Sequence, residues 1–201
     1  MNYLAHAYLS FQQEEILVGN MISDYVKGKK KFDYSPGIQK GITLHRAIDT
    51  FTDNHPATKA AKQFFRPAVG LYAGAFLDVV YDHFLAIDQK EFKNDEALLL
   101  FSTTTYQLLD KQKAVFPERF SRMFPSMQKY NWLYHYQFNW GIERSMTGLV
   151  SRAVYLTDAA PAFKLFEKNY DALKDYYQSF FPELKKYTEL ELIKLNLIKD
   201  I

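Results

Sequence analysis

Cysteine is absent from this chain of 201 residues, which excludes disulfide bonds, thiolate nucleophiles and metal sites built on sulfur. An excess of one charge is also missing. The 25 basic and 23 acidic residues leave a net charge of only +2, so no global field favours a nucleic-acid partner. Histidine, aspartate and glutamate are therefore the only strong metal ligands that the chain offers.

Long apolar runs are missing too. Nowhere do about 18 apolar residues follow one another, so the sequence predicts no membrane span. The opening residues, MNYLAHAYLS, lack the basic and apolar regions of a secretory signal, and we expect a soluble cytoplasmic protein. No internal repeat, low-complexity linker or long charge block divides the chain, so residues 1–201 are expected to form one domain. The sequence does not indicate an oligomeric state.

Helical periodicity dominates what is present, and 48% of the residues are hydrophobic and available for a core. Glycine and proline divide the chain into stretches of helical length, with no competing strand pattern. The predicted fold class is all-α, a single irregular helical bundle. The expected helices span residues 3–10, 13–27, 36–53, 57–65, 70–87, 94–115, 119–129, 132–155 and 161–179, with a short helix after Pro182.

Four of the five histidines lie within the first 83 residues, where aspartates recur at helical spacing. Residues four apart share one face of a helix and can direct their ligand atoms to one point. In the segment 36–53, one such stripe contains His45, Asp49 and Asp53. An imidazole and a carboxylate one turn apart can bind one metal together, or the carboxylate can orient the imidazole. A surface ion pair is the alternative interpretation.

The segment 70–87 is apolar around its circumference except for Asp78, Asp82 and His83, which predicts a helix buried on all sides. A buried polar group without a partner costs about 2–7 kcal/mol, and two neighbouring carboxylates repel each other. A bound cation satisfies both requirements, so we expect a metal at this helix. The alternative is a structural pair satisfied by an arginine or by backbone donors.

Other polar residues accompany these two segments. Asn20 and Asp24 are one turn apart and follow Gly19, where another backbone or a ligand can approach closely. His6 lies in an apolar helix, where a lone histidine is more often a core residue than a ligand. The other two histidines are expected to be structural: His55 and His135.

Several stretches, taken in order, carry a family resemblance. They are NYLAHAYLS near the start, GNMISDYVKG at 19–28, GITLHRAIDTFTDNHP at 41–56 and DVVYDHFLA at 78–86, with further similarity over 141–152 and 161–181. They resemble the successive motifs of the acyl-carrier-protein phosphodiesterase family. The resemblance implies an all-helical, HD-domain-like fold and a metal-dependent hydrolase, usually with manganese. The implied reaction cleaves the phosphodiester between 4'-phosphopantetheine and a serine of holo-acyl carrier protein, giving the apo carrier.

The chain departs from the His-Asp dipeptide after which HD proteins are named. It has His45-Arg46 and, in reversed order, Asp82-His83, so the usual ligand scheme does not map position by position. Mixed carboxylate and imidazole ligation favours Mn²⁺ or Fe²⁺ over Mg²⁺, with Zn²⁺ as a further candidate. The residues expected in or against the metal shell are Asp24, His45, Asp49, Asp78 and Asp82.

The expected chemistry assigns roles to the remaining residues. A divalent ion lowers the pKa of a bound water from about 15.7 toward about 7 and neutralises charge on a phosphoryl oxygen. His6 and His83 are expected to be ligands or proton-transfer groups. Arg46 is expected to hold a nonbridging phosphate oxygen, because guanidinium is a preferred partner of phosphate. Asp53 is expected to orient His45 or Arg46.

Substrate recognition is predicted from charge. Acyl carrier proteins are acidic, so basic residues beside Asp24 are expected to steer them, although a solvated loop is the alternative. The aromatic content of 17% can line a channel for the pantetheine arm or fill the core. The predicted substrate-binding residues are Asn20, Lys27, Lys29, Lys30 and Arg46, with Lys31 in the same basic stretch.

Two other functions compete with this prediction. An HD-type nucleotide phosphohydrolase, nucleotidase or cyclic phosphodiesterase would use the same metal with a different substrate pocket. A non-catalytic helical binding module would bind no metal, and its buried acids would only stabilise the fold.

Overall fold

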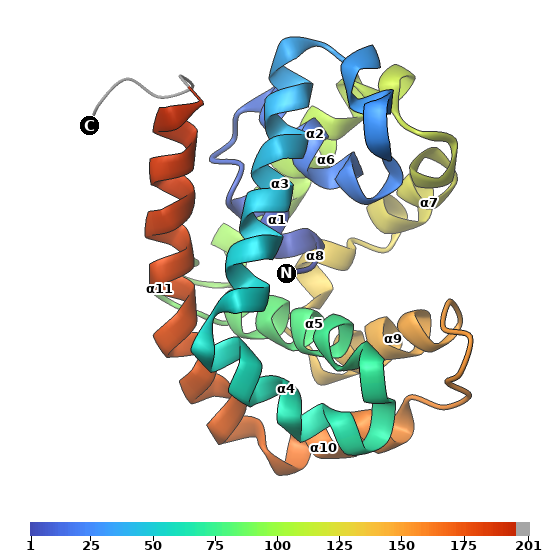
Figure 1. The fold of residues 1–201 in the computed structure, drawn as a ribbon, viewed down its shortest axis with the longest axis vertical. Coiled ribbons are helices and arrows are strands. Elements are labelled where there is room, and N and C mark those ends of the chain that lie inside the picture. The colour runs from blue at the N-terminus through green and yellow to red at the C-terminus, as the bar shows by residue number, and fades with distance from the viewer. Residues whose placement is uncertain (196–201) are drawn as a thin grey trace.

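The chain folds into helices joined by short turns, as a computed structural model that describes residues 1–195 shows (Figure 1). No strand occurs within these residues, so the predicted all-α class is confirmed. None of the described helices is both long and apolar enough to cross a membrane. The α-helices are α1 (Tyr3–Tyr8), α2 (Glu14–Ile22), α3 (Pro36–Asn54), α4 (Pro56–Val69), α5 (Ala73–Ala86), α6 (Asp95–Lys111), α7 (Glu118–Lys129), α8 (Trp132–His135), α9 (Asn139–Val150), α10 (Ala160–Lys168) and α11 (Tyr170–Lys194). The short 3-10 turns are η1 (Ser23–Tyr25), η2 (Gly28–Asp33), η3 (Gly70–Tyr72) and η4 (Lys113–Val115).

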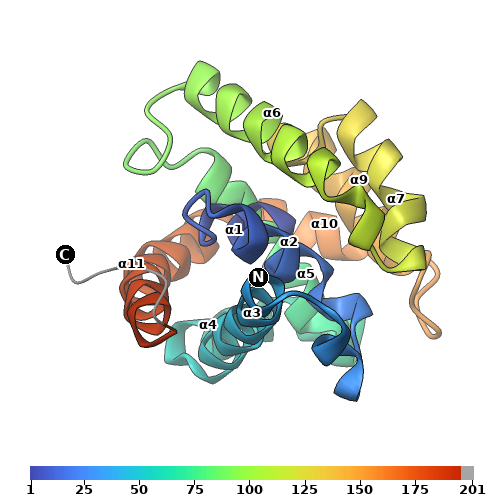
Figure 2. The same cartoon turned by 90° about the horizontal axis from the view of Figure 1, so that it is seen from above.

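Helix α5 is the central helix of the bundle. It packs against α1, α4, α9 and α11, and every residue from 79 to 86 is buried. Both views show α11 on the opposite side of the molecule from α7 (Figures 1 and 2). The prediction of a helix buried on all sides is confirmed for residues 79–86 and is wrong for the beginning of the predicted segment. The helix begins only at Ala73, Leu71 is fully exposed, and the Asp78 side chain is 29% exposed.

One predicted helix, over residues 132–155, is broken in the structure. Helix α8 ends at His135, and α9 begins at Asn139. Between them the Tyr136 side chain is buried, and its carbonyl oxygen accepts a hydrogen bond from His83 on α5. Gly141 lies so close to the turn that a Cβ atom there would come within 2.0 Å of the His135 carbonyl oxygen. Tertiary contacts with α5 therefore outweigh the local helical pattern.

Helix α11 continues through a proline that was predicted to interrupt it. The observed break falls earlier, at Asn169, whose side chain donates to the Leu165 carbonyl oxygen at 2.8 Å. Pro182 removes one backbone hydrogen bond and costs about 3 kcal/mol in a helix interior. The buried side chains of Phe181 and Leu184 lie on either side of it, and their packing holds the helix together.

A pair of glycines brings α2 and α3 into close contact. A Cβ atom on Gly19 would come within 2.2 Å of the Ile38 carbonyl oxygen, and one on Gly41 within 2.4 Å of the Ile16 carbonyl oxygen. Only glycine permits this approach of two helix backbones. The close backbone approach predicted at Gly19 is thus confirmed, and it places α2 directly against the face of α3 that carries His45.

Candidate metal centre

Two buried histidines from different helices lie face to face. His6 on α1 and His45 on α3 have stacked rings, with centroids 3.9 Å apart and planes inclined by 15°. Only 3% of His6 and 5% of His45 is exposed. Since 39 positions separate these residues, the contact depends on the packing of α1 and α3 against α2.

Asn20 on α2 determines how both imidazoles are hydrogen-bonded. Its side-chain nitrogen donates to the His6 carbonyl oxygen at 2.9 Å and to the Ser10 hydroxyl at 3.1 Å. Its side-chain oxygen therefore accepts from His6 Nδ1 at 2.8 Å. The backbone carbonyl of Asn20 accepts from His45 Nδ1 at 2.7 Å. Both Nδ1 atoms are donors, so in the neutral imidazoles both Nε2 atoms keep a lone pair.

Both Nε2 atoms face carboxylates. The two oxygens of Asp49 lie 3.2 Å from His6 Nε2 and 3.0 Å from His45 Nε2. Asp24 Oδ1 lies 3.2 Å from His45 Nε2. The Asp24 and Asp49 side chains are 71% and 39% exposed, so this group opens to solvent on its carboxylate side. We call His6, His45, Asp49 and Asp24 the histidine–carboxylate cluster.

The charges of the cluster are coupled. Burial lowers the pKa of His6, and the neighbouring His45 lowers it further. Burial also acts to lower the pKa of His45, but hydrogen bonds to Asp24 and Asp49 outweigh it and raise that pKa to about 9. Burial acts to raise the pKa of Asp49, but the two histidines hold it well below its usual range. Asp49 is therefore ionised, and one of two adjacent imidazoles is kept neutral.

The cluster fits a divalent cation. His6 Nε2 is buried and has no hydrogen-bond partner among the described residues, despite its closeness to Asp49. Imidazole and carboxylate donors suit Mn²⁺, Fe²⁺ and Zn²⁺. Ligand atoms that share one ion at bonds of about 2.1 Å lie about 3 Å apart, similar to the observed contacts. Metal-binding histidines also commonly donate their other ring nitrogen to an oxygen, as both imidazoles do here.

Asp78 lies beside the cluster and is joined to it through the amino group of Met1. That amino group lies 3.0 Å from Asp78 Oδ1 and 3.6 Å from Asp49 Oδ1. Burial acts to lower the pKa of the amino group, but Asp78 and Asp49 outweigh it and raise the pKa to about 10. The place of Asp78 in the metal shell stays a prediction, supported by this position next to Asp49.

Asp82 has a different position from the one predicted for a metal ligand. It is fully buried, and its carboxylate accepts backbone N–H groups from Asn2 at 3.2 Å, Leu4 at 2.7 Å and Ala5 at 3.3 Å. Burial raises its pKa to about 7, although the Met1 amino group and these hydrogen bonds act in the opposite direction. Asp82 therefore caps the start of α1, because the first N–H groups of a helix have no partner within it. Asp82 thus matches the alternative interpretation of this segment, in which backbone donors satisfy the buried carboxylate.

His83 is also engaged away from the cluster. Its Nδ1 lies 2.7 Å from the Tyr136 carbonyl oxygen, and its Nε2 lies 2.9 Å from the Tyr170 hydroxyl. Burial lowers its pKa. The structure therefore does not bring His83 to the site as a ligand or proton-transfer group. His55 has the predicted structural role, since its Nδ1 accepts the Ala57 N–H at 3.2 Å and begins α4.

Two predicted catalytic residues on α3 lie at the surface. Asp53 pairs with Lys62, one helix further along, and so does not orient His45 or Arg46. The exposed Arg46 donates from Nη2 to the Val26 carbonyl oxygen at 3.1 Å, which leaves other N–H groups of its guanidinium for an anion. The role predicted for Asp53 is thus at odds with its position, whereas the role of Arg46 stays a prediction.

Asn20, which was predicted to bind substrate, lies behind the two imidazoles and away from the surface. It is fully buried, and all of its side-chain polar atoms are used by His6 and Ser10. Its role is to orient the two imidazoles from behind. Ser10 was missed by the sequence analysis; its hydroxyl donates to the His6 carbonyl oxygen at 2.7 Å. The only signal for it is the one-turn spacing from His6.

The predicted basic rim is exposed beside the cluster. Lys27, Lys29 and Lys30 lie on the surface around η2. Lys27 and Lys30 line one open cavity together with Asp24 and Arg119 of α7. Arg119 is a further cationic residue that the sequence analysis missed, because only the packing of α7 brings it near Asp24.

Together, the fold and the cluster define an all-helical protein with an imidazole–carboxylate centre open to solvent. The sequence profile described as "Acyl carrier protein phosphodiesterase" matches residues 1–184. The chain belongs to the acyl carrier protein phosphodiesterase family. This confirms the recognition of the family from the four sequence motifs, and with it the placement of the chain among the phosphoric diester hydrolases.

Curated relatives are similar over almost the whole chain. A protein of Serratia proteamaculans named acyl carrier protein phosphodiesterase is 32% identical over 92% of this chain and 95% of its own length. Proteins of the same name from Klebsiella pneumoniae and Escherichia coli O6:H1 are 32% and 30% identical over 94% and 92% of this chain, and over 98% and 95% of their own lengths. No solved structure matches the chain.

Proposed function

We propose that this protein is a divalent-metal-dependent phosphodiesterase that acts on holo-acyl carrier protein. The observation that carries the proposal is the convergence of two oriented imidazoles on Asp49 in a chain of this family. The family name supplies the carrier-protein substrate. The HD-domain-like detail of the fold and the manganese preference remain predictions, as does the expected cytoplasmic location.

Four residues are proposed to hold the ion: His6, His45, Asp49 and Asp24. When bound, a divalent ion lowers the pKa of a coordinated water and neutralises charge on a phosphoryl oxygen. His45 must lose its proton to become a ligand, and the carboxylates that raise its pKa in the metal-free protein then face the ion instead. Ion binding therefore competes with protonation of His45, and affinity is expected to rise with pH.

The proposed reaction is hydrolysis. A water oxygen forms a bond to phosphorus, the bond from phosphorus to the serine oxygen breaks, and that oxygen takes up a proton. The products are 4'-phosphopantetheine and the serine hydroxyl of the apo carrier. Arg46 is proposed to stabilise a nonbridging oxygen through its free N–H groups. The exposed carboxylate of Asp24 is proposed to hold the ion through one oxygen, beside His45 Nε2, and to accept a proton from water through the other.

The rim of Lys27 and Lys30 is proposed to attract the acidic carrier protein. Exposed charges of this kind act mainly on the association rate and lose their effect at high salt. The rim is therefore assigned to substrate capture, and the chemistry to the cluster.

Incubation with Mn²⁺ and holo-acyl carrier protein tests the proposal. Mass spectrometry of the carrier is expected to show loss of the phosphopantetheine group in the presence of Mn²⁺ and none with a chelator. A panel of nucleotides under the same conditions is expected to remain intact. Nucleotide turnover without loss of phosphopantetheine from several carrier proteins would instead establish a nucleotide phosphohydrolase. An absence of bound metal and of both activities would establish the non-catalytic binding module.

A further inference from the structure

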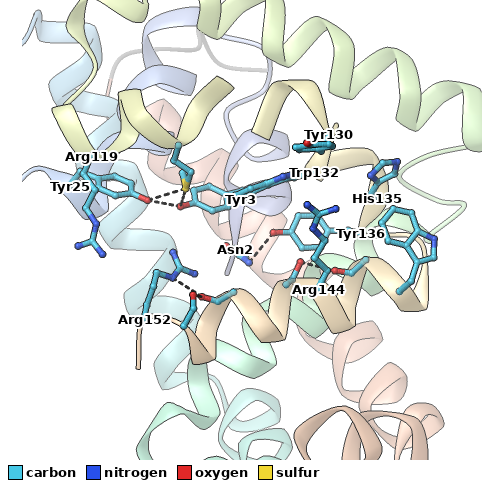
Figure 3. Close-up of a pocket in the computed structure, with 16 residues that line it drawn as sticks. Asn2, Tyr3, Tyr25, Arg119, Tyr130, Trp132, His135, Tyr136, Arg144 and Arg152 are labelled. Carbon is cyan, nitrogen blue, oxygen red and sulfur yellow. Dashed lines mark hydrogen bonds between the residues drawn. The ribbon is translucent and has the colours of Figure 1, made fainter. Parts of the chain in front are cut away.

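A large open cavity lies between the start of α1 and helices α7, α8 and α9 (Figure 3). Its volume is about 400 Å³, within the range of small-molecule sites. Aromatic side chains from separate helices line it, among them Tyr130, Trp132, Tyr136 and Trp140. The histidine–carboxylate cluster does not use these residues, so the cavity is a separate candidate binding site.

Three arginines also face this cavity: Arg119 from α7, Arg144 from α9 and Arg152 from the turn after α9. In the part of the chain that the structure describes, none of them has a carboxylate partner; the one arginine ion pair there is that of Arg122. Arg152 donates to the Gly148 carbonyl oxygen at 3.0 Å, and Arg144 lies 5.0 Å from the centre of the Tyr130 ring. Guanidinium groups held in this way without an anion favour a phosphate ligand.

The arginines are unevenly placed along the cavity. Figure 3 shows Arg119 and Arg152 at the end beside Tyr25, and Arg144 toward the other end with Tyr136 and His135. The Trp140 ring lies 4.6 Å from that of His135. The cavity therefore has one strongly cationic end and one largely aromatic end.

The cationic end adjoins the candidate metal centre. Tyr25 and Arg119 line both this cavity and the one that contains Asp24. Tyr25 directly follows Asp24 in η1, and its hydroxyl lies 2.7 Å from that of Tyr3 at the start of α1. A ligand whose phosphate lies between Arg119 and Arg152 thus has its charged group next to the cluster and its remainder along the aromatic side chains.

We propose that this cavity is the subsite for the 4'-phosphopantetheine arm, with the phosphate between Arg119 and Arg152 and the arm against Trp132 and Trp140. The inference rests on the proposed function, because that function supplies the arm. The arm is a narrow chain of methyl, hydroxyl, amide and thiol groups, which suits a cavity whose aromatic walls also carry polar side chains such as Asn2 and Ser145. A nucleotide would place a flat base there instead, and is an outcome that the test distinguishes.

Tryptophan fluorescence of metal-free protein tests the assignment, because the chain has two tryptophans and both line the cavity. Titration with 4'-phosphopantetheine is expected to change the fluorescence in a saturable way. Pantetheine, which lacks the phosphate, is expected to bind about 10-fold more weakly, since it loses charge-assisted hydrogen bonds. Inorganic phosphate and AMP are expected to give no comparable saturable change.

Arginine variants distinguish binding in the cavity from a general effect of positive charge. Arg119→Gln and Arg152→Gln are each expected to weaken 4'-phosphopantetheine binding about 10-fold. Arg122→Gln on the same helix as Arg119 is the matched control, because Arg122 pairs with Glu118 and does not line the cavity; it is expected to leave binding unchanged. In steady-state cleavage, Arg152→Gln is expected to raise the KM for holo-acyl carrier protein more than it lowers kcat.

The outcomes for the subsite and for the proposed function differ. A wild-type protein that cleaves holo-acyl carrier protein but gives no fluorescence change with 4'-phosphopantetheine overturns the subsite alone. Binding that is unaffected by both arginine variants, or tighter binding of AMP, overturns it as well. Binding of 4'-phosphopantetheine that depends on Arg119 and Arg152, in a protein that cleaves no carrier, supports the subsite and overturns the proposed function.

Discussion

Two sets of histidine and aspartate look alike in the sequence but differ in the structure. On α3, His45 and Asp49 belong to a group whose Nδ1 atoms are held from behind and whose Nε2 atoms face exposed carboxylates. On α5, Asp82 and His83 have every polar side-chain atom bonded to protein partners. The first set is open to a ligand, and the second is closed.

The difference shows what decides whether a buried polar pair is functional. Spacing along a helix places the side chains, but their partners decide whether any ligand position is left free. Asp82 is satisfied by the start of α1, about 80 residues away, and His83 by α11 and the turn before α9. A closed pair contributes to stability, whereas an open group keeps binding capacity at some cost in stability.

The largest effect is expected from Asp49→Asn, which tests the open set. Cleavage of holo-acyl carrier protein with Mn²⁺ is expected to fall by more than about 100-fold. This exceeds the loss that is typical when a residue hydrogen-bonded to a metal ligand is changed. Asp53→Asn, one turn further along the same helix, is expected to keep activity because Asp53 pairs with Lys62. Rates for the two variants under saturating substrate provide the measurement. Equal losses in both would remove the distinction between them.

The next effect concerns the closed set. Asp82→Ala leaves three backbone N–H groups at the start of α1 without a partner, so the free energy of unfolding is expected to fall by about 2–4 kcal/mol. Asp24→Ala removes an exposed carboxylate of the open set and is expected to cost less than about 1 kcal/mol. Urea unfolding of both metal-free variants measures this. A larger loss for Asp24→Ala would reverse the assignment of the two sets.

A smaller effect, on the affinity for Mn²⁺, is expected from changing Asn20, which orients the imidazoles of the open set. Asn20→Ala removes the oxygen that accepts from His6 Nδ1, so the Kd for Mn²⁺ is expected to rise about 10- to 100-fold. Asn54→Ala, at the exposed end of α3, is the control and is expected to leave the Kd unchanged. Calorimetric titration of the folded variants gives both constants. Wild-type affinity in Asn20→Ala would show that the imidazoles need no such support.

The smallest effect is a pH dependence of the closed set. Burial lowers the pKa of His83 below its unfolded value of about 6.5, so below that pH the folded state binds fewer protons than the unfolded state. This contribution to stability is complete above about pH 6.5 and is lost as pH falls, with a slope of at most about 1.4 kcal/mol per pH unit. His83→Gln is expected to lose less stability than the wild type between pH 7 and 5. Parallel curves for the two proteins would contradict this.

Local signals were enough to predict the ends of α3. Its predicted span of 36–53 matches the observed Pro36–Asn54, because Pro36 follows the capping residue Ser35 and both act within one turn. The break between α8 and α9 could not be predicted in this way. It depends on the Tyr136 carbonyl oxygen meeting His83, more than 50 residues away, which no local pattern contains.

The site was predictable only in part, for the same reason. The spacing of His45 and Asp49 indicated a shared ligand position because both lie on one helix. The part played by Asn20 depends on Gly19 and Gly41, which let α2 and α3 approach until the Asn20 carbonyl oxygen reaches His45. Burial of Asp82 was predicted correctly, but its partners are backbone groups, which leave no mark in the amino-acid sequence.

The most direct measurement is the binding of Mn²⁺ to metal-stripped protein, with wild type, Asp49→Asn and Asp82→Ala compared below their unfolding temperatures. We expect saturable binding to wild type and to folded Asp82→Ala, and none to Asp49→Asn. Loss of binding in Asp82→Ala with full binding in Asp49→Asn would contradict the proposed metal centre, because the ion would then belong to α5 and not to the histidine–carboxylate cluster.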